Sequence, residues 1–449
     1  MNLRAGIPSR LAQIHRTTVF VLAAAALAAL AACGGANRPN VLLLVLDTTR
    51  ADRCSFTGYA RPTTPRIDQF AKDAVVFDQA WSPANWTGPS HASLFTGLGP
   101  GKHGFHSDAR PHLPLKPATI AERFSTAGYA TACFTNNQIV APEFGLTRGF
   151  GEVFPLYRAD NRKYPWAAAT HEAAANWAKA MHDAGRPFLL FINDMEPHQP
   201  YDPPEDIARK FVRGTPSDAE MREARAFGNR EALACILGVR RLSAERTALL
   251  NDLYDAEIAT LDREVGVLLD RLKADGLLDS MLVVIVSDHG ESIGERGWFD
   301  HSNGLYRHLL HVPLLIRAPG RFDGGRRVHD LVRLEDVAPT MLEICDLPPI
   351  EGADGVSLCG DLPGRVARAE QAPNGLFATR TRNELPGVDP APVAVGIRSV
   401  FDGAYHFLSY TDGRRELFDT VADPGETRDL SSAKPDEVAR LSALLRASH

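Results

Sequence analysis

Short apolar runs separated by longer amphipathic stretches dominate the pattern of hydrophobic and polar positions along the chain. Runs of buried-strand type lie at 41–46, 75–77, 129–135, 188–192 and 281–286. Between them, apolar residues at helical spacing predict helices at 61–71, 118–127, 171–184 and 244–278. Because strands that alternate with helices pair in parallel, we predict a mostly parallel α/β sheet with helices on both faces.

The last quarter of the chain has a different pattern. Its predicted elements are a helix at 333–345, a Pro/Gly-rich connection at 348–373, short strands at 393–397 and 405–408 and a helix at 435–445. Short strands in close succession predict a small C-terminal antiparallel sheet, closed by the last helix. We therefore expect a main catalytic domain at 33–365 and a C-terminal subdomain at 366–449.

The N-terminus has the pattern of a lipoprotein export signal. Three arginines precede an apolar run at 19–29, which is too short to favour a membrane-spanning helix. Leu30-Ala31-Ala32-Cys33 follows, and the small residues suit cleavage before the cysteine. We expect a signal peptide at 1–32 and lipidation of Cys33, which would anchor the protein in the cell envelope, facing the periplasm or the exterior. Simple cleavage and retention as an anchor are the alternatives.

The net charge of the chain bears on its binding partners, and its cysteine content bears on its disulfides. Removing the leader takes three positive charges from a chain whose formal net charge is already −6. An acidic chain argues against a nucleic-acid partner, and the oligomeric state stays open. Five further cysteines are scattered without zinc-type spacing, so the disulfide connectivity stays open as well: Cys54, Cys133, Cys235, Cys345 and Cys359.

Three stretches carry the candidate chemistry. Asp47 follows the first predicted strand, and Asp288 and His289 follow the strand at 281–286. The carboxyl ends of strands are where open α/β sheets bind ligands. Thr87 precedes Gly-Pro-Ser and a helix-competent run, which places its hydroxyl near a helix N-terminus, where unpaired amides favour an alkoxide or a bound oxyanion. Taken alone, this last segment is also an ordinary helix cap.

Together, Asp47, Thr87, Asp288 and His289 predict a site for one divalent metal ion. Coordination would make the threonine hydroxyl a nucleophile near neutral pH, as it does for bound water. Carboxylate, imidazole and hydroxyl ligands suit Mn²⁺, Zn²⁺ or Ca²⁺, and the imidazole favours the first two.

These stretches resemble the sulfatase family of the alkaline phosphatase superfamily, over about residues 40–430. The matching segments are Asp47, Thr87-Gly88-Pro89-Ser90-His91-Ala92-Ser93-Leu94-Phe95-Thr96-Gly97, Pro197-His198-Gln199-Pro200-Tyr201, Ser287-Asp288-His289-Gly290-Glu291, Leu305-Tyr306, Val312-Pro313-Leu314-Leu315-Ile316, Glu416-Leu417-Phe418-Asp419 and Ala422-Asp423-Pro424-Gly425-Glu426-Thr427. The resemblance implies a metal-dependent ester hydrolase with that family's fold and a small-molecule, glycan or lipid ester as substrate.

The chain departs from the family's pattern at the reactive positions. Thr87 stands where the family has a Cys or Ser that is oxidised to formylglycine, and threonine could give only a ketone. His91 replaces an Arg, Thr48 replaces the second Asp of a pair, and Thr135-Asn136 replace Gly-Lys. A threonine nucleophile resembles instead the superfamily's phosphodiesterases and its phosphoethanolamine or glycerolphosphate transferases.

The resemblance also implies roles for neighbouring residues. His198 matches a substrate-binding histidine, and His301 lies where the family has a substrate-binding Lys or His. We expect His91, Asn136 and His198 to stabilise the transferred group and His301 to protonate the leaving oxygen. In phosphatase relatives an Asp-x-x-x-His pair holds a second metal, which predicts a second site at Asp194, His198 and His301. In the competing arrangement there is one ion, and Asp194 only orients its neighbours.

Release of the covalent intermediate separates the two candidate chemistries. Formylglycine hydrate expels sulfate with its second hydroxyl, which a sulfothreonine lacks, whereas water can attack a phosphothreonine. The sequence therefore predicts cleavage of a phosphate monoester, phosphodiester or phosphonate through a covalent Thr87 intermediate. Sulfate ester hydrolysis and phosphoryl-group transfer to an envelope lipid or glycan are the alternatives, and a non-catalytic lipoprotein that binds an anionic glycan or head group is a further one.

Overall fold

A computed structural model describes residues 38–105, 111–158, 166–322, 324–362, 364–373 and 375–446. The unit Asn40–His449 contains all the elements below. The predicted signal peptide and Cys33 lie outside the described residues. Within the described part of the chain, no helix combines the length and the apolar character needed to cross a membrane.

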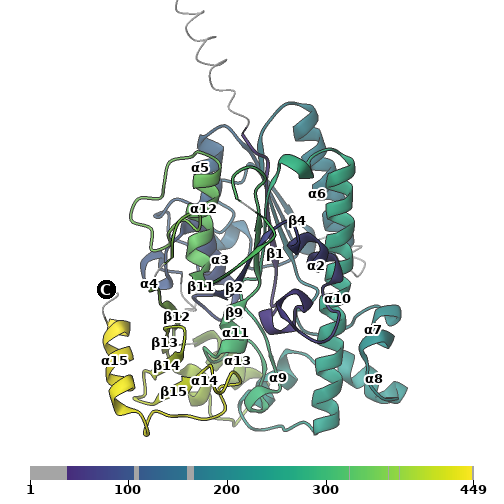
Figure 1. The fold of residues 1–449 in the computed structure, drawn as a ribbon. Helices are drawn as coiled ribbons and strands as arrows, with labels where there is room; N and C mark the ends of the chain where they lie inside the picture. Colours follow the sequence, from purple (N-terminus) through teal and green to yellow (C-terminus); the bar gives the residue numbers. More distant parts are fainter. Residues whose placement is uncertain are drawn as a thin grey trace, which may run out of the picture. The chain divides into compact units, whose positions relative to one another are not determined.

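The central element is a nine-stranded sheet in the described part of the chain (Figure 1). Its strands are β1 (Val41–Leu46), β2 (Val75–Trp81), β3 (Ala130–Thr135), β4 (Glu152–Pro155), β5 (Phe188–Asp194), β6 (Leu282–Val286), β9 (His311–Val312), β10 (Leu314–Arg317) and β11 (Arg326–Arg333). The order is β11-β2-β10-β6-β1-β5-β3-β4, with β9 paired to β2. β1 pairs in parallel with β5 and β6, whereas β10 runs antiparallel between β2 and β6. The predicted mostly parallel sheet is confirmed.

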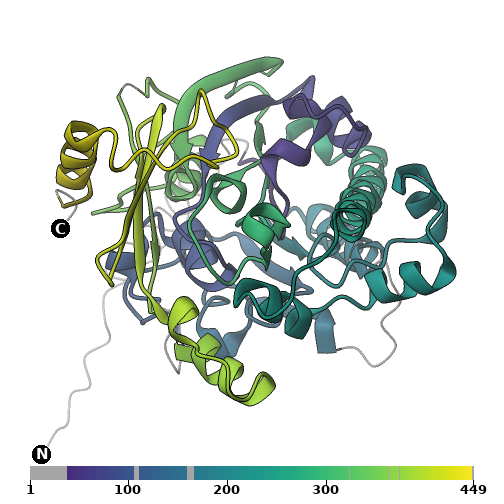
Figure 2. The same ribbon diagram turned by 90° about the horizontal axis from the view of Figure 1, so that it is seen from below.

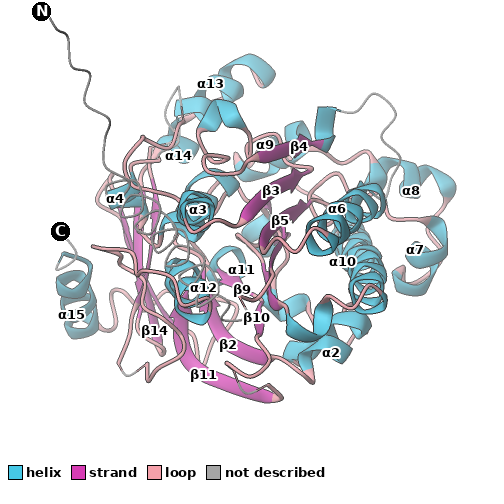
Figure 3. Ribbon diagram, turned by 90° about the horizontal axis from the view of Figure 1, so that it is seen from above, coloured by secondary structure: helices cyan, strands magenta, loops and turns pink. Residues whose placement is uncertain are grey.

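Helices cover both faces of this sheet (Figure 3). Alternate residues of β1 enter two different cores because successive side chains of a strand point to opposite faces. One core is covered by α3 (Thr87–Thr96), α5 (Ile120–Thr126) and α12 (Val337–Ile344). The other is covered by α2 (Pro65–Ala71), α6 (Trp166–Asp183) and α10 (Ala244–Ala274). The predicted arrangement of helices is therefore confirmed, with boundaries that differ by a few residues.

The C-terminal region forms a separate four-stranded antiparallel sheet in the described residues (Figure 2). Its strands, in order, are β12 (Ala367–Gln371), β13 (Ile397–Phe401), β14 (Tyr405–Tyr410) and β15 (Arg415–Asp419). Helix α15 (Pro435–Arg446) packs Val438, Leu441 and Leu445 against one face of this sheet. The small antiparallel sheet with its closing helix is confirmed, and the boundary predicted at 365/366 falls directly before β12.

Two local predictions in this region are wrong. The segment predicted as a strand at 393–397 begins as a helical turn, α14 (Ala391–Ala394), because prolines at 390 and 392 suit a helix start; the strand begins only at Ile397. The connection at 348–373 contains β12, whose alternating burial shows a half-buried strand. The remaining elements are short: α4 (Pro100–His103), α7 (Glu205–Phe211), α8 (Asp218–Arg225), α9 (Asn229–Ile236), α11 (Arg307–Leu310), α13 (Gly375–Glu384), β7 (Ser292–Ile293) and β8 (Phe299–Asp300).

Candidate active site

The carboxyl ends of β1 and β6 bring three of the predicted metal ligands together. The two strands are direct neighbours, so Asp47 after β1 meets Asp288 and His289 after β6. All three side chains are fully buried. His289 Nε2 lies 3.3 Å from Asp288 Oδ2 and 3.8 Å from Asp47 Oδ1.

The atoms of this cluster fit a cation. His289 Nδ1 lies 2.9 Å from the carbonyl oxygen of Gly290 and donates to it, so Nε2 carries a lone pair. Asp47 Oδ1, Asp288 Oδ2 and His289 Nε2 are buried without hydrogen-bond partners, and all lie within 4.8 Å of one another. Three lone pairs that face each other away from water are stable only with positive charge between them. The donors of the cluster therefore suit a divalent metal ion.

The surroundings of Asp288 stabilise its ionised form. Burial by itself would raise the pKa of Asp288, but His289, His91 and the backbone N–H of Thr48 lower it well below its usual range. Thr48 N donates to Asp288 Oδ1 at 3.3 Å, and His289 N donates to the same oxygen at 3.0 Å. Thr48 adopts a left-handed backbone conformation, φ 58°, which is uncommon for a β-branched residue. The strained turn after Asp47 thus aims an amide at the second carboxylate.

Thr87 is the first residue of α3 and is 4% exposed. Asn137 Nδ2 donates to Thr87 Oγ1 at 3.1 Å and to Asp47 Oδ2 at 2.7 Å. One side-chain amide therefore joins the predicted nucleophile to a predicted metal ligand. Asn193, at the end of β5, also donates to Asp47 Oδ2, at 3.4 Å. The sequence interpretation had assigned no role to Asn137 or Asn193.

The predicted substrate-binding residue Asn136 lies elsewhere. Its Nδ2 donates to Thr170 Oγ1 of α6 at 2.8 Å, so its side chain is turned away from Thr87. The reason is a local turn in which Thr135 Oγ1 accepts from Asn137 N and donates to Asn137 O, both at 3.0 Å. This turn points the second asparagine, not the first, toward α3. Asn137, and not Asn136, is therefore the asparagine that contacts Thr87.

His91 supports the site from within α3. It is fully buried, and its Nδ1 lies 3.0 Å from the carbonyl oxygen of Thr87 and 3.4 Å from Asp288 Oδ2. Burial lowers the pKa of His91, but the hydrogen bond and the charge of Asp288 outweigh burial and raise it. The side chain thus contacts the predicted ligand Asp288 directly, and its Nε2 is buried without a partner.

Asp194 is not brought together with His198 and His301, as the predicted second metal site requires. Asp194 Oδ2 lies 2.8 Å from His171 Nε2 of α6. In β5, residues 188, 190 and 192 face α6 and α10, and Asp194 follows the same alternation, whereas Asn193 faces α3. The second group of potential metal ligands in the described residues is instead Glu291, Asp300 and His301.

Two histidines border the metal cluster. The ring of His301 lies 4.4 Å from that of His289 and 5.1 Å from that of His198, between centroids. His198 Nδ1 lies 2.7 Å from the carbonyl oxygen of Gln199, and His301 Nδ1 lies 3.1 Å from Glu291 Oε1. Among the described residues, neither Nε2 atom has a hydrogen-bond partner. His301 therefore lies directly beside the cluster, and His198 lies behind it as the neighbour of His301.

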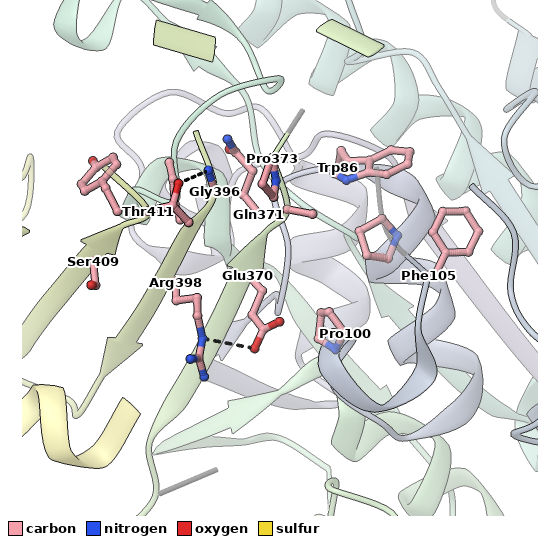
Figure 4. A pocket seen from close by; sticks show the side chains of 14 residues that line it. Trp86, Pro100, Phe105, Glu370, Gln371, Pro373, Gly396, Arg398, Ser409 and Thr411 are labelled. Carbon is pink, nitrogen blue, oxygen red and sulfur yellow. Dashed lines mark hydrogen bonds and ion pairs between the residues drawn. The ribbon is translucent and has the colours of Figure 1, made fainter. Parts of the chain in front are cut away.

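A separate cavity of about 270 Å³ lies beside Trp86 (Figure 4). Trp86 and Phe105 line one side, and the ion pair between Arg398 and Glu370, 3.6 Å apart, lines another. Its lining contains none of Asp47, Thr87, Asp288 and His289. The cavity is thus distinct from the metal cluster.

The fold and the cluster together define an α/β ester hydrolase that carries its site at the carboxyl ends of sheet strands. The chain belongs to the sulfatase family: the family model described as Sulfatase matches residues 39–347. A second model, described as N-sulphoglucosamine sulphohydrolase, C-terminal, matches residues 294–447. Membership of this family confirms the predicted sulfatase-like ester hydrolase.

Known proteins with similar sequences and structures agree with this membership. An arylsulfatase of Clostridium perfringens is 25% identical over an alignment that covers 72% of this chain and 78% of the arylsulfatase. A choline-sulfatase of Rhizobium meliloti is 25% identical over an alignment that covers 92% of this chain and 87% of that enzyme. A phosphonate monoester hydrolase of Agrobacterium radiobacter has a similar fold, with a TM-score of 0.75 at 22% identity over 92% of this chain and 96% of the hydrolase.

The five described cysteines are all unpaired: Cys54, Cys133, Cys235, Cys345 and Cys359. Four of them are buried, and Cys359 is exposed. Disulfides among these residues therefore contribute nothing to the stability of the described fold.

Proposed function

We propose that the protein hydrolyses monoanionic phosphorus esters, meaning phosphodiesters or phosphonate monoesters, through a covalent intermediate on Thr87. The observation that carries the proposal is the amide of Asn137, which donates both to Thr87 Oγ1 and to the metal-cluster residue Asp47. A hydroxyl that accepts such a bond is stabilised further when it becomes an alkoxide, because hydrogen bonds to charged oxygens are the stronger ones. Thr87 is also the first residue of a helix, where the dipole favours negative charge.

The chemistry follows from these positions. Thr87 releases its hydroxyl proton to water, and its Oγ1 attacks phosphorus in line. The new Oγ1–P bond forms as the bond to the leaving oxygen breaks, and His301 gives that oxygen a proton. A divalent cation held by Asp47, Asp288 and His289 would supply positive charge beside the hydroxyl and the transferred group. Asn137 stabilises the oxygen of Thr87 before attack. Water then attacks the phosphothreonine, and Thr87 leaves with its hydroxyl restored.

The charge of the site favours a substrate with a single negative charge. His91 and Thr135-Asn136 stand where the family carries an arginine and a lysine. Among the described residues, no lysine or arginine side chain is hydrogen-bonded to the side chains of the metal cluster or Thr87. A phosphate monoester carries close to two negative charges near neutral pH and would lack matching cations here. Phosphodiesters, phosphonate monoesters and sulfate esters each carry one.

Sulfate ester hydrolysis is the second candidate, and the sulfatase model that matches residues 39–347 favours it. Two of the relatives reported above are named as sulfatases, the arylsulfatase and the choline-sulfatase. Against it stands Thr87, which carries one hydroxyl on its side chain and cannot form the aldehyde hydrate that expels sulfate. We therefore rank phosphorus esters first and transfer of a phosphoryl group to an envelope acceptor next.

Thr87→Ala tests the proposal against a panel of p-nitrophenyl phosphodiester, phosphonate, phosphate and sulfate esters. We expect wild type to prefer the first two and the variant to lose at least about 10³-fold in kcat, as other enzymes do without their nucleophile. Thr96→Ala is the matched control, because this buried threonine of the same helix donates to the carbonyl oxygen of Ala92 and accepts from Leu98 N, and neither partner belongs to the site. Unchanged turnover in Thr87→Ala would refute the nucleophile, and a preference for sulfate would establish the second candidate.

We also propose that the mature chain is anchored in the cell envelope through Cys33. Support comes from the leader sequence and its Leu30-Ala31-Ala32-Cys33 motif. A site tethered in this way meets substrates outside the inner membrane, where phosphorus and sulfate esters of lipids, glycans and small molecules are accessible.

A further inference from the structure

Gln371, the last residue of β12, is a polar residue on an apolar face of the C-terminal sheet. The alternation of β12 places Ala367, Ala369 and Gln371 on the same, buried side. Both alanines pack in an apolar cluster with Trp81 and Leu305. Gln371 is 4% exposed. A buried glutamine amide has two N–H donors and an oxygen with two lone pairs, which need partners where water is excluded.

The amide of Gln371 finds a partner for each of these positions. Its Oε1 accepts from Gly304 N at 2.9 Å and from Asn85 Nδ2 at 3.0 Å. Its Nε2 donates to Val395 O and to Asn303 Oδ1, both at 3.3 Å. Because a main-chain N–H only donates and a main-chain carbonyl only accepts, Gly304 and Val395 determine which end of the amide is the oxygen. The side chain is therefore fully paired and fixed in orientation.

Two of the segments that Gln371 joins carry residues of the site. Asn85 lies two residues before Thr87, and its Nδ2 also donates to His301 O at 2.8 Å. Asn85 Oδ1 is buried without a partner among the described residues, so the bonds of Nδ2 are what orient this side chain. Gly304 lies three residues after His301. Gln371 therefore connects the segment before α3, the segment after β8 and the C-terminal sheet.

We propose that Gln371 is a positioning residue that sets the place of Thr87 relative to the segment of His301. The inference rests on the ester cleavage proposed above, in which Thr87 must approach phosphorus in line. A displacement of about 1 Å in such an arrangement can cost about 10²-fold in rate. The C-terminal sheet thereby completes a site whose reacting residues all belong to the main domain.

Other contacts hold the C-terminal sheet in place without the side chain of Gln371. Glu370 N donates to Pro83 O at 2.9 Å, so the main chain of β12 already meets the segment before α3. Gly304 has φ 97°, and an added Cβ there would lie 2.9 Å from the ring of Tyr306, so glycine is required where the chain brings its N–H to Gln371. The apolar cluster around β12 packs independently of the amide. Variants of Gln371 should therefore fold with the two segments slightly displaced.

A competing explanation comes from the cavity beside Trp86, which Gln371 also lines (Figure 4). A substrate group bound in that cavity would contact Gln371 directly. Loss of such a contact weakens binding and raises KM, whereas misplacement of Thr87 slows the chemical step and lowers kcat. The two explanations thus predict changes in different kinetic parameters.

Two substitutions of Gln371 test the inference with a p-nitrophenyl phosphodiester. Gln371→Met keeps the length of the side chain and removes its hydrogen bonds, so we expect a loss of about 10²-fold in kcat, with KM within about threefold of wild type and the bound metal unchanged. Gln371→Asn keeps an amide in the apolar cluster but is too short to reach both segments, so kcat should fall at least about tenfold. This second variant decides the question if Gln371→Met does not fold.

Tyr306→Phe is the matched control. The Tyr306 hydroxyl also bonds into the C-terminal sheet, to Tyr410 Oη at 3.0 Å and Glu416 Oε2 at 2.8 Å, but neither partner belongs to the site. We expect Tyr306→Phe to lower the melting temperature and to keep kcat within about threefold of wild type. A loss of kcat equal to that of Gln371→Met would show general damage and overturn the inference.

A double variant tests whether Gln371 acts through the segment before α3. If it does, Asn85→Ala should lower kcat as well, and the double variant with Gln371→Met should lose no more than about threefold beyond the weaker single variant. Multiplied losses would overturn the inference, as would a Gln371→Met effect confined to KM or a loss of bound metal. Wild-type kcat in Gln371→Met and Gln371→Asn would overturn this inference alone, whereas turnover retained in Thr87→Ala would refute the proposed nucleophile.

Discussion

Replacing Asn137 by alanine should reduce turnover far more than replacing its neighbour Asn136. Both side chains are nearly buried, but only Asn137 reaches Thr87 Oγ1 and Asp47, whereas Asn136 reaches Thr170. Removing one preorganised donor to a developing oxyanion costs about 10²–10³ in kcat, or about 3–4 kcal/mol. We expect a loss in this range for Asn137→Ala.

The effect of the two substitutions on stability should be similar. Each removes a buried side-chain hydrogen bond and leaves a partner unsatisfied, which lowers the free energy of unfolding by about 1–3 kcal/mol. Asn137 Oδ1 also accepts from Ile139 N at 2.8 Å, so its loss belongs at the upper end of that range. The pair therefore separates a catalytic role from a structural one.

The assay is steady-state hydrolysis of a p-nitrophenyl phosphodiester at saturating metal, with thermal melts of both variants. Asn136→Ala should keep kcat within about threefold of wild type, because none of its hydrogen bonds involves the site. Equal kcat losses in Asn136→Ala and Asn137→Ala would refute the reasoning. A loss for Asn137→Ala that appeared only in KM would refute it as well, because a donor to the attacking oxygen must act on kcat.

Three further predictions concern the metal, the anchor and the pH dependence of stability. Asp288→Asn should abolish stoichiometric binding of Mn²⁺, Zn²⁺ or Ca²⁺ in elemental analysis, whereas Asp194→Asn should leave one equivalent bound. Loss of metal in Asp194→Asn would instead support the second metal site that the sequence predicts. Cys33→Ser should move the protein to the soluble fraction or leave the leader uncut, and unchanged partitioning would disprove lipidation. Burial raises the pKa of Asp262 from 3.8 to about 7, so the folded state binds the proton of this carboxyl more tightly than the unfolded state does. Because of this residue, the free energy of unfolding therefore falls as the pH rises between these two values. Asp262→Asn should remove that part of the slope in thermal melts at a series of pH values, and an unchanged slope would contradict it.

The metal ligands could be predicted from the sequence because each directly follows an apolar run. β1 and β6 are short continuous runs of buried residues, and the strand ends of a parallel sheet lie at one edge. Placing Asp47 beside Asp288 and His289 needed only that these two strands be neighbours, which the structure confirms. Placing Thr87 near a helix N-terminus needed only that α3 begin there, which the structure confirms.

The asparagines and Asp194 could not be predicted in the same way. Which of Asn136 and Asn137 faces the site depends on a side-chain turn made by Thr135, and hydrophobic periodicity does not register such a turn. The partner of Asp194 is His171, which lies on a separate helix. That pairing depends on the packing of α6 on the sheet, a tertiary contact that no local pattern in the sequence contains.

The position of the metal cluster links ion binding to the folding of nearly the whole chain. β1 opens the sheet, while β6 follows α10 after most of the other strands, and the cluster exists only where these two strands are paired. A cation bound there stabilises every state in which the pair is formed and no state in which it is open. At a concentration one hundred times its Kd it would add about 2.7 kcal/mol to the free energy of unfolding. The slowest amide protons of β1, β5 and β6 should therefore exchange more slowly as metal is added, all by the same factor, because the ion stabilises the paired state of the central strands.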